Sequence, residues 1–309
     1  MGAEHAGVGA GGLHHGEILQ GAVRRDGELL PCLITLPLAG VGSSARYVSA
    51  ETLLGSGSTG QGAAALPVAP TWKRKAAKAA RLTLAFIGAP AEGRLEIECG
   101  VATGVGLGSS TCDVVAAIRA VCDFHGASLD ACDVARLAVE AEGAADPLMF
   151  DGEMVLFAQR HGRVLEYFGP WVPRYTLLSI DTDAGNDGVD TLGLPFPAYT
   201  DAELIAFEDM IGRARAAFCA RDFEAIAAVA TESATLNQRF LPLRQFRAIR
   251  ELADEYRALG VQISHSGTVA GVLFDEARQI ASDGDLAAQL TTRVRSLGLR
   301  PLGLFTTGD

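Results

Sequence analysis

The chain has 309 residues, of which 26 are Lys or Arg and 37 are Asp or Glu, so its formal net charge is −11. A surface of this sign repels phosphate backbones and anionic lipids, which argues against nucleic-acid and membrane-surface partners. Six scattered cysteines without a C-x-x-C pair, and no run of 18 apolar residues, predict a cytoplasmic protein with no membrane span.

The first half of the chain alternates strand-like and helix-like segments. In chain order the predicted elements are strands at 29–38 and 45–50, a Gly/Ser/Ala/Pro-rich loop at 55–70, a helix at 72–85, a strand at 94–99, an amphipathic helix that includes 114–122, a helix at 130–142, and a hairpin of 154–159 with 163–168. Asp130 is the predicted N-cap of its helix. Lys and Arg crowd the helix at 72–85, either as a solvated face or as a rim that attracts a nucleotide phosphate.

The pattern resets around Gly169, where we place the boundary between a domain of residues 1–169 and one of residues 170–309. The elements predicted after it are a strand at 175–180, helices at 201–220, 222–239 and 243–259, strands at 261–265 and 269–274, a helix at 286–297 and a strand at 299–305. Gly260 is the predicted C-cap of the third of these helices. Strands mixed with pairs of helices indicate an α+β fold.

Glycine is concentrated in three predicted turns, at 16–21, 104–110 and 264–271. The second turn joins a strand to a helix, so unpaired backbone N–H groups and the positive end of the helix dipole form an anion site. No lysine occurs between residues 101 and 115, which excludes a Walker A loop. Ser109 replaces the third glycine of a dinucleotide fingerprint, which argues against that motif as well.

The sequence of this second turn, Gly-Leu-Gly-Ser-Ser-Thr at 106–111, resembles the phosphate motif of the GHMP kinase superfamily. Three further segments resemble the L-threonine kinases that serve cobalamin side-chain synthesis: His15–Gly21, the Glu-(x)-Asp element at 141–146 with one extra residue, and Val261–Gly271. Their order agrees over residues 15 to 275. The resemblance implies a ribosomal-S5-like N-terminal domain, a ferredoxin-like C-terminal domain, and a site in the cleft between them.

The resemblance also implies ATP and Mg²⁺ as cofactors and assigns the site residues. Ser110 and Glu142 would ligate Mg²⁺, and Asp146 would be the general base, with Ser110 also catalytic. The predicted nucleotide-binding residues are Gly104, Gly106, Leu107, Gly108, Ser109, Ser110 and Thr111. The predicted substrate-side residues are Glu17, Gln20, His265, Ser266, Gly267 and Thr268.

Several of these residues also have a structural explanation. Ser110 is a normal helix N-cap, and Asp146 before Pro147 is a normal turn former. Glu17 and Gln20 could order a turn, and a lone histidine such as His265 more often has a structural role. For Glu142 a bound cation is the better explanation, because a carboxylate at a helix C-terminus meets the negative end of the dipole and a cation would offset this.

These observations predict an ATP-dependent kinase that phosphorylates the hydroxyl of L-threonine or a related hydroxy amino acid. Another small alcohol such as homoserine or serine, and a phosphorylation-coupled decarboxylase, remain open alternatives. A non-catalytic nucleotide-binding module is the third alternative, which intact Ser110, Glu142 and Asp146 argue against. The expected partner is the small-molecule substrate, and the oligomeric state is open, a homodimer included.

Overall fold

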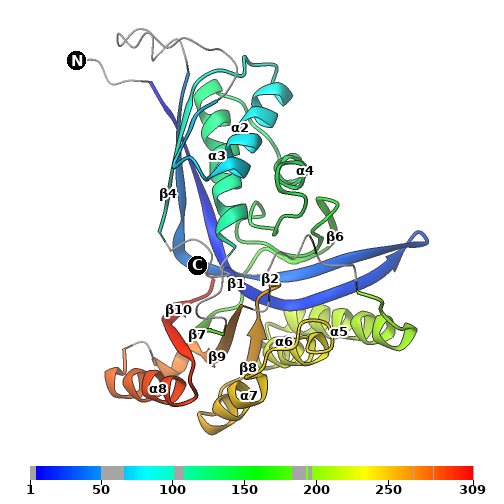
Figure 1. Cartoon of the computed structure of the whole chain (residues 1–309). Coiled ribbons are helices and arrows are strands. Elements are labelled where there is room, and N and C mark those ends of the chain that lie inside the picture. The colour runs from blue at the N-terminus through cyan, green and yellow to red at the C-terminus, as the bar shows by residue number, and fades with distance from the viewer. Residues whose placement is uncertain are drawn as a thin grey trace.

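The computed structural model describes residues 5–49, 66–100, 108–182, 193, 197–266, 268–280 and 282–308. The described strands form one sheet in the order β10-β7-β9-β8-β1-β2-β4-β3, with β5 paired to both β2 and β6. Helices α2, α3 and α4 lie along one half of this sheet and α5 to α8 along the other (Figure 1). The predicted α+β class is confirmed, and the domain boundary after residue 169 stays a prediction.

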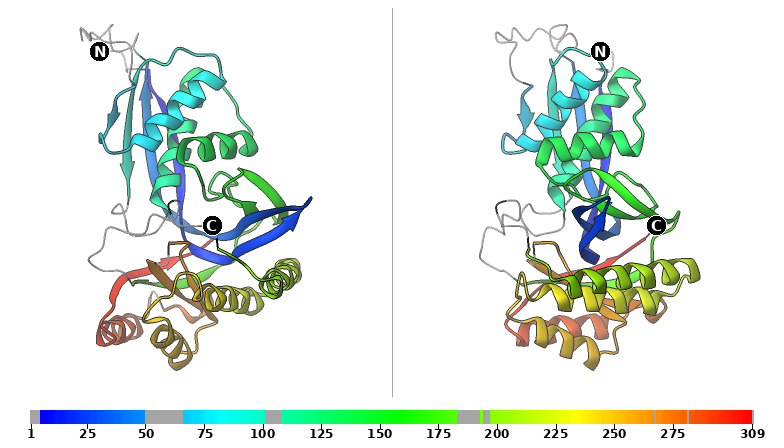
Figure 2. Two further views of the ribbon diagram at one scale, coloured as in Figure 1. Left: turned by 45° about the vertical axis from the view of Figure 1, so that its right-hand side comes forward. Right: turned by 90° about the vertical axis from the view of Figure 1, so that its right-hand side faces the viewer.

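A long antiparallel hairpin joins the two halves of the molecule. Strand β1 (Gly7–Arg25) pairs with β2 (Glu28–Val48) from Arg25 opposite Glu28 to Gly7 opposite Tyr47. One end of the hairpin lies beside α2 and α3, and the other runs above α5 and α6 (Figure 2). Both halves of the molecule therefore share the same two strands.

The remaining elements follow the predicted order. The first half contains β3 (Val68–Ala69), α2 (Arg74–Phe86), β4 (Arg94–Cys99), α3 (Ser109–His125), α4 (Ala131–Glu142), β5 (Met154–Ala158) and β6 (Arg163–Gly169). The second contains β7 (Tyr175–Asp181), α5 (Asp201–Ala220), α6 (Phe223–Asn237), α7 (Phe246–Glu255), β8 (Gly260–Ile263), β9 (Val269–Asp275), the 3₁₀ turn η1 (Glu276–Arg278), α8 (Gly284–Ser296) and β10 (Arg300–Thr306). Asp130 caps α4 as predicted, because its side chain accepts a hydrogen bond from the Asp133 N–H.

Four sequence predictions about these elements are wrong. The segment 16–21 is no turn but the middle of β1, and the strands predicted at 29–38 and from residue 45 are parts of one continuous β2 that ends at Val48. Residues 68–69 form a short strand inside the predicted loop. Gly260 begins β8 instead of capping α7, which already ends at Glu255 and is followed by Arg257 with φ at +52°.

The N-terminal glycines explain why β1 does not look like a strand in sequence. A Cβ at Gly7, Gly9 or Gly11 would overlap the backbone carbonyl oxygen of Ala120, Ala116 or Cys112 in α3. These alternate residues lie on one face of the strand, so the backbones of β1 and α3 make direct contact there. The glycine content thus reflects close packing of a helix on a strand, where any side chain would hold the two apart.

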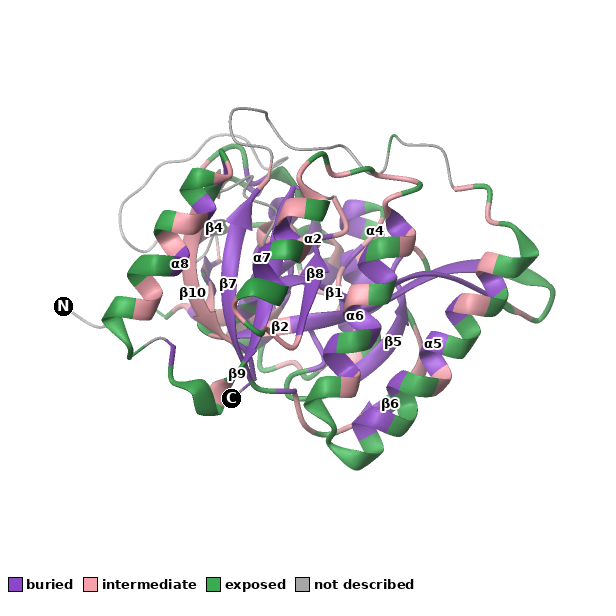
Figure 3. Cartoon of the chain, turned by 90° about the horizontal axis from the view of Figure 1, so that it is seen from below, coloured by how far each residue is buried: buried purple, intermediate pink, exposed green. Residues whose placement is uncertain are grey.

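The second half buries its core between the sheet and helices α5 to α8, whose inner faces are buried and outer faces exposed (Figure 3). Phe207 and Phe218 of α5 pack with Ile226 of α6 against β1 and β2. Ile249 of α7 and Leu290 of α8 pack on β8 and β9. No helix in the described ranges is long and apolar enough to cross a membrane.

We predict that Gly9→Ala destabilises the fold by about 1–3 kcal/mol, the usual cost of overpacking a close contact. Its Cβ would overlap the Ala116 carbonyl oxygen, and neither backbone can move without disturbing the sheet. Gly12→Ala is the matched control, because a Cβ at Gly12 meets nothing within 4 Å. Urea unfolding measures both variants, and equal midpoints would contradict the proposed contact.

Candidate active site

Helix α3 begins at the point where the sequence predicts a phosphate site. Gly108 is its N-cap residue, with φ at +68°, and provides no side-chain hydrogen bond to the first turn. The first-turn N–H groups of Ser109, Ser110 and Thr111 therefore have no capping side chain from this residue and can bind an anion. The predicted Gly104, Gly106 and Leu107 lie outside the described residues.

Ser110 and Thr111 both contact the carboxylate of Glu142. Ser110 Oγ donates to Glu142 Oε2 at 2.5 Å, and Thr111 Oγ1 donates to Oε1 at 2.7 Å. Glu142 is the last residue of α4, so two helix ends meet here: the N-terminus of α3 and the C-terminus of α4. The two predicted metal ligands, Ser110 and Glu142, are thus in direct contact.

The donor set of this contact fits Mg²⁺. A hydroxyl and one carboxylate are oxygen ligands of the kind Mg²⁺ takes from a protein when phosphate oxygens and waters complete its shell. Burial raises the pKa of Glu142 to about 7, although the Ser110 and Thr111 hydrogen bonds and the charge of Lys75 oppose this. A cation would keep this buried carboxylate ionised at neutral pH.

The basic residues at the start of α2 lie beside the N-terminus of α3. Lys73, Arg74 and Lys75 line a hollow of about 180 Å³ together with Ser109 and Ser110. Lys73 forms a buried ion pair with Asp113 of α3, and Lys75 Nζ lies 3.8 Å from Glu142 Oε2. Part of the basic segment therefore adjoins the N-terminus of α3, where it adds positive charge beside the predicted phosphate site.

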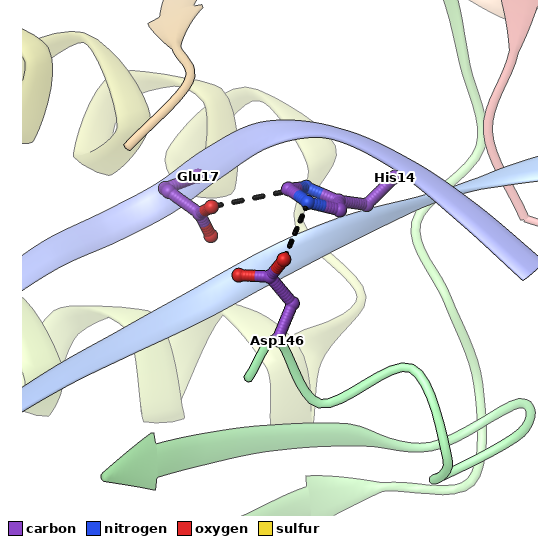
Figure 4. Close-up of side chains that lie close together, drawn as sticks. All are labelled: His14, Glu17 and Asp146. Atoms are coloured by element: carbon purple, nitrogen blue, oxygen red, sulfur yellow. Dashed lines mark hydrogen bonds and ion pairs between the residues drawn. The ribbon is translucent and has the colours of Figure 1, made fainter. Parts of the chain in front are cut away.

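Asp146 lies in a cluster with His14 and Glu17 (Figure 4). Asp146 Oδ2 is 3.0 Å from His14 Nε2, and His14 Nδ1 is 3.8 Å from Glu17 Oε1. Thr111 connects the cluster to Glu142, because its hydroxyl accepts from the Asp146 N–H at 3.3 Å. Asp146 therefore lies next to the predicted phosphate site, where a general base for phosphoryl transfer would act.

The pKa values of the cluster indicate an ion pair. Burial alone would lower the pKa of His14, but the charge of Asp146 and the hydrogen bond to it raise it to about 9. Burial would raise the pKa of Asp146, yet His14 holds it below its usual value. Burial raises the pKa of Glu17 to about 8, against the charge of His14. At neutral pH Asp146 is ionised, His14 is protonated and Glu17 is neutral.

The three ligand atoms of this cluster lie within 4.8 Å of one another, close enough for a metal ion. A protonated imidazole, however, donates hydrogen bonds and has no lone pair for a metal. Glu17 accepts a hydrogen bond from Thr35 at 2.7 Å through its other oxygen. The cluster is therefore better suited to hold the Asp146 carboxylate ionised than to bind a metal.

Two glycines bring His14 to this position, which the sequence analysis did not identify. Gly16 has φ at +63°, and the β1–β2 register shifts between His14 and Glu17, so these residues face the same cluster despite odd spacing. A Cβ at Gly16 would lie 2.7 Å from the Ile263 carbonyl oxygen, and one at Gly108 would overlap the His14 ring. The usable sequence signal was Gly16, two residues after His14, because a glycine inside a strand often marks a bulge.

The third motif forms the turn between β8 and β9. Ser266 Oγ is 3.2 Å from Ser264 Oγ and 2.7 Å from Thr268 Oγ1, and Gly267 lies outside the described residues. His265 Nδ1 lies 3.1 Å from Gln20 Oε1. Burial lowers the pKa of His265, and the charge of Asp146 acts in the opposite direction.

The chain is similar to known proteins in both sequence and fold. Residues 73–150 match the GHMP kinases N-terminal domain model, and residues 214–285 match the GHMP kinases C-terminal model. The chain belongs to the GHMP kinase family. As a family member it is 26% identical over 202 residues to the L-threonine kinase of Salmonella typhimurium and 26% identical over 186 residues to that of Citrobacter freundii.

These matches cover 65% and 60% of this GHMP kinase, and 66% and 63% of the two relatives, which is under two thirds of their own length. The solved structure of homoserine kinase from Cytophaga hutchinsonii has the same fold, with a TM-score of 0.68 at 16% identity. That alignment covers 99% of this chain and 96% of the homoserine kinase. The expected GHMP kinase fold is therefore confirmed.

We predict that the buried cluster makes this GHMP kinase less stable as pH rises. Glu17 and His14 both have folded-state pKa values above their usual 4.5 and 6.5, so the folded state binds more protons. Their contribution is complete at low pH and is lost as pH rises through about 8 and 9. The free energy of unfolding should fall between pH 6 and 9.5, and less so in Glu17→Gln.

Glu28→Gln is the control for this measurement, because Glu28 is an exposed carboxylate at the turn of the same hairpin. It should retain the pH dependence of the parent chain. If Glu17→Gln and Glu28→Gln lose stability in parallel with pH, Glu17 does not titrate in this range.

Proposed function

We propose that this GHMP kinase transfers the γ-phosphoryl group of ATP to the hydroxyl of L-threonine or a related hydroxy amino acid. The observation that carries the proposal is the buried Asp146–His14 pair, joined through Thr111 to the Ser110–Glu142 contact at the start of α3. An ionised carboxylate, the proposed base, would thus act beside a helix N-terminus suited to an anion and a side-chain pair suited to Mg²⁺. The names of the two curated relatives support L-threonine as the acceptor.

The nucleotide would place its phosphates over the first turn of α3. Backbone N–H groups of Ser109 and Ser110 and the dipole of α3 would hold the terminal phosphates, with Lys75 adding positive charge. Ser110 and Glu142 would hold Mg²⁺, which when bound neutralises charge on the phosphates. Holding the anion locally is consistent with a chain whose net charge is −11.

Asp146 would take the proton of the acceptor hydroxyl as its oxygen attacks the γ-phosphorus and the bond to the β-phosphate oxygen breaks, releasing ADP. His14 would keep Asp146 ionised before this step and stabilise negative charge near the attacking oxygen. Gln20 and His265, in mutual contact beside Asp146, would position the acceptor from the other side.

The test of this function is an assay of ADP release with Mg²⁺ and ATP over L-threonine, L-serine, L-homoserine, allo-threonine and simple amino alcohols. We expect a hydroxy amino acid to stimulate release, with no carbon dioxide formed. Carbon dioxide formation would favour a coupled decarboxylase instead. If no hydroxyl compound stimulates ADP release, the chain is no kinase of this type.

Within this assay, Asp146→Asn should lower kcat by about 10²-fold or more, because an amide cannot accept the hydroxyl proton. Asp151→Asn is the control, since Asp151 is exposed and paired with Arg119 on the surface. The control should turn over at the parent rate. Asp146→Asn activity equal to the control would reject Asp146 as the base.

A further inference from the structure

A cavity of about 500 Å³ opens next to the predicted base and is not used by the nucleotide side of the site. Six segments of the chain form it: β1, β2, the turn after β5, the segment before α5, the end of α6 with the residues that follow it, and the turn after β8. The lining residues are Gln20, Gly21, Pro31, Gln159, Arg160, Pro197, Ala198, Tyr199, Asn237, Arg239, Phe240, Leu241 and His265. This cavity has a polar end and an apolar end.

The polar end adjoins Asp146. The backbone carbonyl of Gln159 accepts a hydrogen bond from the N–H of Ala145, the residue before Asp146, at 3.0 Å. His265 lines the same cavity, and its pKa, which burial lowers, is raised by the charge of Asp146 and lowered by that of Arg160. An acceptor in the cavity can therefore present its hydroxyl to Asp146.

The apolar end of the cavity is lined by the aromatic rings of Tyr199 and Phe240. Tyr199 packs edge-on against Phe207 at 5.2 Å and against Phe240 at 4.8 Å between ring centroids. The guanidinium of Arg239 lies over Phe240 and is paired with Glu203, which fixes that ring. Leu241 and Pro197 complete the wall.

The volume exceeds what a free hydroxy amino acid needs. Even if each non-hydrogen atom of L-threonine took as much room as a whole liquid water molecule, about 30 Å³, the amino acid would fill only roughly half of the cavity. Its methyl group would cover only a small part of Tyr199 and Phe240, and the rest of this apolar lining would remain in contact with water. Pockets of this size and lining are typical of ligands with a sizeable apolar part.

We propose that the acceptor is a hydroxy amino acid bearing an apolar group of ring size, which binds against Tyr199, Phe240 and Leu241. This inference rests on the proposed kinase function and narrows its substrate class. The extra apolar contact is worth about tenfold or more in kcat/KM over L-threonine, since a buried ring removes far more apolar surface from water than a methyl.

The experiment compares kcat/KM for L-threonine, L-threo-β-phenylserine and L-threonine anilide in the ADP-release assay. At least one of the two ring compounds should exceed L-threonine about tenfold. Leu241→Trp fills the apolar end and should remove this preference, bringing the ratio to about one or below. Ile205→Trp, an equal change at an exposed position of α5, should leave the ratio unchanged.

Ala198→Trp is a second filling variant that places its bulk at an exposed lining residue, in case Leu241→Trp does not fold. Melting temperatures confirm that each variant is folded.

The outcomes separate the two proposals. If no hydroxyl compound releases ADP, the kinase function itself is wrong. If L-threonine is turned over with the highest kcat/KM of the three, or if neither filling variant changes the ratio, the function stands and the apolar acceptor group is rejected.

Discussion

The pairing of the Asp146 carboxylate with the His14 imidazole, 3.0 Å apart, is the interaction on which the rest of the site depends. Without an opposite charge, burial would protonate Asp146 and remove its capacity to act as a base. The imidazole reaches this position only because Gly108 has no side chain and Gly16 shifts the register of β1. One electrostatic pair therefore ties β1, the start of α3 and the segment after α4 into a fixed geometry.

The helix ends impose a second, opposite constraint. The N-terminus of α3 attracts negative charge, whereas Glu142 places a carboxylate at the C-terminus of α4, where the dipole disfavours it. Burial adds to this cost, as its pKa of about 7 indicates. A fold selected only for stability would not retain such a carboxylate, whereas a cation-dependent site uses it, because the unfavourable energy is recovered when a cation arrives.

The sequence was sufficient for the fold class, most helices and the motifs around Ser110, Glu142 and Asp146, because local periodicity and short spacings carry that information. It was not sufficient for β1, since Gly9 and its neighbours look like a loop until α3 is placed against them. His14 was missed for a similar reason. Its partner Asp146 is 132 residues away, and only the folded sheet brings the two together.

Two compartments adjoin the site. The basic hollow at Lys75 adjoins Glu142 and Ser110, and the large cavity is lined by Gln159, whose backbone carbonyl accepts a hydrogen bond from the N–H of the residue before Asp146. Phosphoryl transfer requires attacking and leaving oxygens roughly in line, with little covalent help from the protein. A nucleotide in the hollow and an alcohol in the cavity would meet this requirement through position alone. Catalysis would then depend on keeping the two compartments aligned, which the shared β1–β2 hairpin does.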